Sequence, residues 1–201
     1  FPDKIDELEF KSATIGGSKL AHHNIDYLLN NDNIEVSKPF ELVILQGGST
    51  EPLSKESREA FSKKAKSFVK KIKHTGADAA LYMIHAYVEP HEDFDPNMIN
   101  KVTKSYSETG ALTDSLVLPV GIAFKNAYAK QPNVQLHKDF DGTHPDLLGT
   151  YLSACVLFAS IYKISPKEIK YNYFNRIGDE DRLFLQQIAH DTVESYFKLK
   201  L

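Results

Sequence analysis

The sequence predicts an α/β domain with a mostly parallel sheet, and two observations lead to this prediction. Short apolar runs rich in β-branched residues alternate along the chain with longer segments whose apolar residues recur at helical spacing. The chain has 201 residues and 42% hydrophobic content, which suits one domain with a sizeable core. Strands that alternate with helices are typical of a parallel sheet with right-handed crossovers. We therefore expect a single domain over residues 1–201, in which 163–201 form a C-terminal helical extension.

The first half of the chain contains three expected strands. A short strand is predicted over Glu9 to Ile15, and a helix follows over Lys19 to Asn30. The run Phe40 to Leu45 (FELVIL) has the apolar and β-branched character of a strand buried in a parallel sheet. Asp78 to Ala86 (DAALYMIHA) is a second buried strand by the same criterion.

The helices are predicted from their caps, stops and periodicity. Ser54 offers an N-cap to a helix that runs to about His74, and Gly76 is its expected C-terminal stop. The remaining expected elements are a loop over 87–97, a helix over 96–108, an extended piece over 116–118, a helix over 119–129, a short strand over 134–136, a helix from after His144 to about Tyr162, and a helix over 179–198.

Charge and composition exclude several classes of protein. The net charge is −3, and the longest basic stretch, Lys63 to Lys73, is the solvated face of an amphipathic helix, so a nucleic-acid partner is not expected. No apolar run approaches the ~20 residues that span a bilayer. Cys155 is the only cysteine and cannot form an internal disulfide. We expect no cofactor and no metal. The oligomeric state is open, and so is the compartment, with a soluble protein exported from a bacterial cell as one option.

The most informative motif is Asp141-Gly-Thr-His144-Pro145. An acid three residues before a histidine, on a turn that opens a helix, can orient the imidazole and leave its far nitrogen as a general base. The alternative is an aspartate that caps a helix beside an ordinary surface histidine. Functional groups in parallel sheets gather at the carboxyl ends of strands, and the ends of the expected strands carry Gly16-Gly17, Gln46-Gly47-Gly48, His85 and the Asp141–His144 turn. This coincidence favours a catalytic site.

With these residues the chain resembles the SGNH (GDSL-like) hydrolases, which are esterases with a three-layer, flavodoxin-like fold. Their last sequence block is D-x-x-H followed by a helix, and it stands here as Asp141 to His144 continuing into Leu148-Gly-Thr-Tyr-Leu152. The resemblance implies that Asp141 orients His144, which acts first as base and then as acid. It implies an acyl or acetyl ester as substrate, on a small molecule or a carbohydrate.

The resemblance also implies an oxyanion hole. The family's second block contributes a backbone N–H from a glycine, which favours Gly16 and next Gly17. The third block usually provides an Asn, which is missing from Ile44-Leu-Gln46-Gly47-Gly48-Ser49. The donor is therefore open between Gln46, the backbone of Gly47 or Gly48, and Ser49. A variant branch with a Leu-Gln third block is the closer likeness and favours Gln46.

The family's first block, a strand that ends in Gly-Asp-Ser or Gly-Asn-Ser and carries the nucleophile, is not found in this sequence. We expect it upstream of Phe1. Ser18 is the other candidate, because Ile15-Gly-Gly-Ser18 has the strand–Gly-x-Ser–helix context. Two points oppose Ser18: the sheet would lack a strand, and the interval to Ser49 suits the second and third blocks. The alternative to an enzyme is an inactive binding or scaffolding protein that kept the fold.

Overall fold

The structure is a computed structural model and describes residues 8–201. Its sheet contains three parallel strands in the order β1-β2-β3, namely β1 (Leu42–Gln46), β2 (Asp78–Tyr82) and β3 (Leu116–Leu118). Leu42 lies opposite Asp78, and Ala80 lies opposite Leu116. The predicted α/β fold with a parallel sheet is confirmed.

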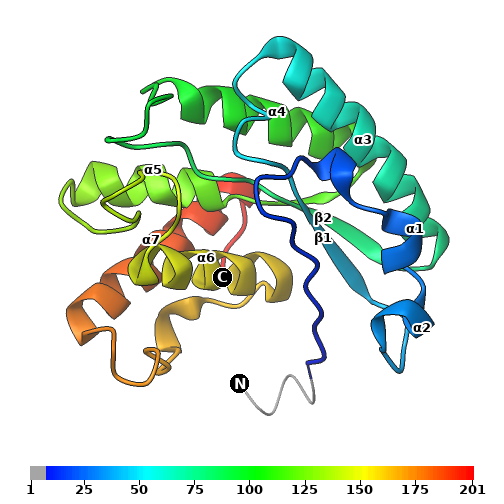
Figure 1. Cartoon of the computed structure of the whole chain (residues 1–201). Helices are drawn as coiled ribbons and strands as arrows, with labels where there is room; N and C mark the ends of the chain where they lie inside the picture. The colour runs from blue at the N-terminus through cyan, green and yellow to red at the C-terminus, as the bar shows by residue number, and fades with distance from the viewer. Residues whose placement is uncertain (1–7) are drawn as a thin grey trace.

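Seven α-helices and two short 3-10 turns accompany the sheet in the described part of the chain. They are η1 (Leu20–His22), α1 (Ile25–Leu28), α2 (Asn31–Ile34), α3 (Lys55–His74), α4 (Met98–Thr113), α5 (Val120–Lys130), α6 (Leu147–Tyr162), η2 (Pro166–Glu168) and α7 (Asp179–Phe197). Helices cover both sides of the sheet, with α3 and α4 on one side and α6 and α7 on the other (Figure 1).

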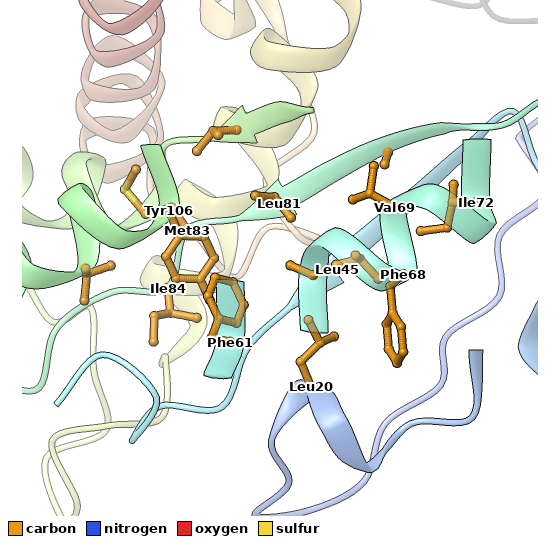
Figure 2. Packing of buried hydrophobic residues seen from close by; sticks show 14 of the residues in the cluster. Leu20, Leu45, Phe61, Phe68, Val69, Ile72, Leu81, Met83, Ile84 and Tyr106 are labelled. Carbon is orange, nitrogen blue, oxygen red and sulfur yellow. The ribbon is translucent and has the colours of Figure 1, made fainter. Parts of the chain in front are cut away.

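The core on the first side forms between the sheet and the inner faces of α3 and α4. The helix α3 begins where the sequence predicts, because the Ser54 hydroxyl accepts a hydrogen bond from the Ser57 N–H at 3.0 Å. Its apolar stripe packs on strand side chains, as Figure 2 shows for Phe61, Phe68, Val69 and Ile72 around Leu45 and Leu81.

The second side of the core is formed by α5, α6 and α7. Fully or nearly fully buried side chains from all three helices share this cluster, among them Phe124, Leu152, Val156, Leu185 and Ile188. The two sides are joined through β2, since the Tyr82 hydroxyl donates to Ser153 Oγ of α6 at 3.1 Å.

Two N-terminal predictions are wrong. Residues 9–15 form no strand and are exposed, with Phe10 77% exposed. A strand needs a partner for its backbone groups, and none of the residues from 8 onward provides one. The helix predicted over Lys19 to Asn30 is broken into η1 and α1, because the Asn24 side chain caps α1 by accepting from the Tyr27 N–H at 3.2 Å.

The predicted strand at 134–136 is also wrong. A single antiparallel bridge between His137 and Pro145 takes its place. The strand predicted over Asp78 to Ala86 is shorter than expected, because it ends at Tyr82. Beyond it, the Met83 carbonyl accepts the Gly121 N–H of α5 at 3.0 Å.

One edge of the sheet is open along β1. The Asp78 N–H donates to the Glu41 carbonyl at 2.9 Å, so residues 41, 43 and 45 direct their backbone groups toward β2. In a parallel ladder the alternate residues 42, 44 and 46 face the other way. No described residue pairs with that edge, and Ile44 is 39% exposed there.

Candidate functional site

The predicted acid–histidine pair is formed. His144 Nδ1 lies 2.7 Å from Asp141 Oδ2, and the His144 side chain is 72% exposed. The other carboxylate oxygen, Asp141 Oδ1, accepts the backbone N–H groups of Thr143 and His144 at 2.9 and 3.0 Å. These bonds, the Thr143 N–H first, lower the pKa of Asp141 to about 2. The carboxylate is therefore ionised at neutral pH and holds the ring with Nε2 facing away from it.

A short hairpin carries this turn. The Lys138 N–H donates to the His144 carbonyl at 2.8 Å, and the Asp146 N–H donates to the Leu136 carbonyl at 2.8 Å. We call residues 136–146 the site hairpin. Gly142 lies at its tip with φ of +63°. Residue 142 has to be glycine because a Cβ there would lie 2.1 Å from the Val88 carbonyl oxygen.

The two glycine turns predicted for the oxyanion hole lie against each other. A Cβ on Gly48 would be 2.5 Å from the Ser18 carbonyl oxygen. Glu51 joins the turns, because its Oε2 accepts the N–H of Gly48 at 2.5 Å and the N–H of Leu20 at 3.3 Å. Glu51 is 5% exposed, so these backbone groups satisfy a buried carboxylate.

Because of this packing, fewer hydrogen-bond donors are available for the predicted oxyanion hole. The N–H of Gly48 is bound to Glu51, and the N–H of Gly47 donates to the Tyr106 hydroxyl at 3.1 Å. Gly16 and Gly17 have no acceptor for their N–H groups among residues 8–201. The Gln46 side chain is exposed at the end of β1 and makes no hydrogen bond in the same range.

The loop that follows β2 connects the glycine turns to the site hairpin. The Tyr87 hydroxyl is hydrogen-bonded to Ser49, and the Val88 N–H donates to the Gly142 carbonyl at 2.9 Å. The Tyr87 ring also stacks on His91, with centroids 3.6 Å apart. His144, Ser49 and the glycine turns therefore share the carboxyl edge of the sheet, which is where the sequence predicts a site.

A buried polar chain lies beneath the hairpin. His137 Nδ1 is 2.7 Å from the Tyr128 hydroxyl, and His137 Nε2 is 2.9 Å from His85 Nδ1. Burial lowers the pKa of His137 to about 4. Burial, with a smaller contribution from the charge of His137, lowers the pKa of His85 to about 3. Both rings are neutral at pH 7.

The low pKa values of these two histidines predict that the folded protein loses stability in mild acid. Their pKa values are lower in the folded protein than the ordinary 6.5, so the unfolded chain binds their protons first. Stability is then complete above pH 6.5 and falls as the pH decreases toward 4. We expect the free energy of unfolding to drop by about 2 kcal/mol per histidine between pH 7.5 and 5. Urea unfolding at pH 7.5, 6.5, 5.5 and 5 measures it.

The matched variant for this experiment is His137→Gln. Between pH 7.5 and 5, the free energy of unfolding of this variant should drop by about 2 kcal/mol less than that of the unmodified protein, whatever its stability at pH 7.5. Equal slopes for the two proteins would contradict the assignment of a neutral, buried His137.

Ser18 does not meet His144 in this arrangement. Its Oγ lies 3.4 Å from His23 Nε2, on the short helix-turn segment that follows. His144 Nε2 has no hydrogen-bond partner among residues 8–201. The site as described thus contains a base and its orienting carboxylate.

Sequence reasoning missed Glu51 and His137. Glu51 follows Gly47-Gly48 within a short polar turn, and a carboxylate beside two glycines is a weak signal of burial. His137 follows the strand expected over Val134 to Leu136 and precedes the Asp141 turn, and that position is its only signal.

No three His, Cys, Asp or Glu side chains between residues 8 and 201 lie close enough to hold a metal ion. No described helix combines the length and the apolar character needed to cross a membrane.

Solved structures share this fold. A DUF4886 family protein from Bacteroides uniformis superposes with a TM-score of 0.74 over 92% of this chain and 83% of its own, at 17% identity. A protein from Slackia heliotrinireducens described as a "putative SGNH hydrolase" matches with a TM-score of 0.58 over 72% and 80%, at 20% identity. An acetyl xylan esterase, AlAXEase, matches with a TM-score of 0.55 over 74% and 79%, at 17% identity.

The sequence itself matches no family model and no curated protein. The structural likeness at these identities concerns the fold. Residues 8–201 have an α/β fold with a three-stranded parallel sheet that matches SGNH-fold structures.

Proposed function

We propose that this protein is a serine-type ester hydrolase in which His144 is the general base and Asp141 its orienting carboxylate. The observation that carries the proposal is the 2.7 Å contact between His144 Nδ1 and Asp141 Oδ2 at the carboxyl edge of the sheet. The exposed ring has a free Nε2, which is the nitrogen that a nucleophile would use.

The proposed reaction has two steps. A serine oxygen attacks the ester carbonyl while His144 Nε2 takes the hydroxyl proton, and the imidazolium is stabilised by Asp141. The alkoxide leaves with that proton and an acyl-serine remains. Water then attacks the acyl group and loses a proton to His144, which gives it to the serine oxygen as the acyl–serine bond breaks, so that the acid leaves and the serine hydroxyl is restored.

The nucleophile is proposed to come from a strand that pairs with the open edge of β1. Residues 42, 44 and 46 direct their backbone groups to that edge, and an apolar strand with an unpaired side is poorly protected. A parallel strand added there would end beside Gln46, next to the glycine turns. A segment upstream of Phe1 that ends in serine fits this position, and Ser18 is the alternative nucleophile.

The oxyanion is proposed to be held by the N–H of Gly16 or Gly17 and by the Gln46 side chain. These are the predicted donors that the described residues leave unbound. We expect Gln46→Ala, in the full-length gene product, to lower kcat by about 10²- to 10³-fold with little change in KM. Steady-state hydrolysis of p-nitrophenyl acetate measures it, and Ser49→Ala in the same assay tests the other side-chain donor. An unchanged kcat in Gln46→Ala would exclude its amide from the hole.

The proposed substrate is an acyl or acetyl ester, on a small molecule or a carbohydrate. The acetyl xylan esterase among the structures with this fold supports an acetylated carbohydrate. Release of acetate from acetylated xylan and from p-nitrophenyl acetate by the full-length gene product tests the class of reaction. Activity that is lost with EDTA would instead favour metal-dependent hydrolysis.

The second candidate function is a non-catalytic binding or scaffolding protein. It is favoured by one observation, that no serine hydroxyl within residues 8–201 contacts His144. A full-length protein without turnover on any ester, and without reaction with a fluorophosphonate, would favour this second function.

A further inference from the structure

One buried histidine anchors the hairpin that carries the Asp141–His144 pair. His137 is 4% exposed and stands at the bridge with Pro145, where the two arms of the site hairpin meet. Its backbone belongs to the hairpin, and its side chain points away from it into the core. The side chain therefore connects the hairpin to the rest of the fold.

That side chain joins two further elements. Nδ1 contacts the Tyr128 hydroxyl of α5, and Nε2 contacts His85 Nδ1 in the segment that follows β2. The rings pack as well as bond, because His85 stacks on Phe124 with centroids 4.6 Å apart and meets the His137 ring edge-on at 4.6 Å. The hairpin is thus fixed against both the sheet and a helix.

The two side-chain bonds of His137 use both of its ring nitrogens. Each of its two bonds needs one donor and one acceptor, and a neutral imidazole has one of each. His137 therefore donates through one nitrogen and accepts through the other. Removing the Tyr128 hydroxyl or the His85 ring takes a side-chain partner from a buried nitrogen of His137, beside which, among the described residues, only the Ala86 backbone remains as a hydrogen-bonding group. The lost bond weakens the attachment of the hairpin.

We propose that His137 is a positioning residue for His144, which it holds in place by binding the site hairpin to Tyr128 and His85. The His144 side chain is exposed, and its one side-chain partner, Asp141, lies on the same turn of the chain. The place of the ring above the sheet edge therefore depends on how firmly the hairpin is attached. The titratable groups that face the chain are Asp141 and His144, which act on the pKa values of His137 and His85 respectively.

The first experiment measures the hairpin directly and needs no turnover. Amide hydrogen exchange is followed in the full-length gene product on peptides that cover 136–146, where the Lys138, Gly142 and Asp146 N–H groups are hydrogen-bonded. We expect Tyr128→Phe, which removes one oxygen from a half-buried ring, to speed exchange of these amides roughly tenfold. Peptides from α3 should exchange as before.

The matched control is His190→Gln. His190 is also buried, at 8% exposed. Its Nδ1 is hydrogen-bonded to Ser165 Oγ at 3.0 Å and its Nε2 lies 3.5 Å from Glu194 Oε1, away from the hairpin. This variant should leave the exchange of 136–146 unchanged. Normal protection of the hairpin in Tyr128→Phe would overturn the proposal, and so would an equal increase in every peptide of that variant.

The second experiment rests on the proposed function. In an active full-length enzyme, His137→Phe should lower kcat by about 10- to 100-fold with KM nearly unchanged. His137→Gln, whose amide can both donate and accept, should recover most of the loss. A change confined to KM, or equal kcat for the two variants, would overturn the positioning role. If the unmodified enzyme hydrolyses no ester, the proposed function fails, while the exchange experiment still decides the role of His137.

Discussion

Replacing His144 by alanine should lower kcat for p-nitrophenyl acetate by at least about 10³-fold in the full-length gene product. The imidazole takes the proton from the nucleophile and returns it to the leaving group, and no other histidine in the described residues is paired with Asp141. KM should change little, because the ring is proposed to act on the reacting atoms. The His144 side chain is 72% exposed, so the unfolding midpoint should stay within experimental error.

The control for this variant is His74→Ala. His74 is an exposed histidine that ends α3, at the opposite edge of the sheet, and its removal should leave kcat unchanged. A His144→Ala enzyme that retains its activity would show that His144 is not the general base. Asp141→Asn should be less damaging than His144→Ala, because the ring keeps its place on the hairpin and loses the charge that stabilises its cation.

Replacing Gly142 by alanine should have the largest effect on structure near the site. A Cβ would lie 2.1 Å from the Val88 carbonyl oxygen and 3.1 Å from the His91 N–H nitrogen, and φ at this position is +63°. Both the clash and the left-handed backbone disfavour any side chain. We expect a loss of about 2–4 kcal/mol in the free energy of unfolding. Thermal unfolding measures it as a decrease in Tm of about 5–10 °C.

Gly178→Ala is the matched control for Gly142→Ala. Gly178 precedes α7, has ordinary φ, and no atom lies within 4 Å of a Cβ built there. Its Tm should stay close to that of the unmodified protein. A Gly142→Ala protein with the same Tm as Gly178→Ala would show that the hairpin tip does not pack against the loop after β2 as described.

The elements that the sequence predicts well are those with strong local signals. The Ser54 cap and the apolar stripe behind it define α3 almost to the residue, and the β-branched run at Leu42–Gln46 forms β1. The pairing of Asp141 with His144 was also predictable, because a three-residue spacing on one turn brings the two side chains together without help from the rest of the fold.

The failed predictions depend on distant partners. Residues 9–15 were expected to form a strand, yet no neighbouring strand among the described residues pairs with them. The burial of Glu51 and the bonds of His137 to Tyr128 and His85 join positions far apart in sequence. Contacts between residues far apart in the sequence leave no recognisable pattern in the local sequence, so they become visible only in the folded structure.

The most direct test of the central claim is fluorophosphonate labelling of the full-length gene product, followed by peptide mapping. We expect one labelled serine, in a strand upstream of Phe1 or at Ser18, and we expect the label to be lost in His144→Ala. A label that His144→Ala retains, or no label on a folded protein, would contradict this expectation.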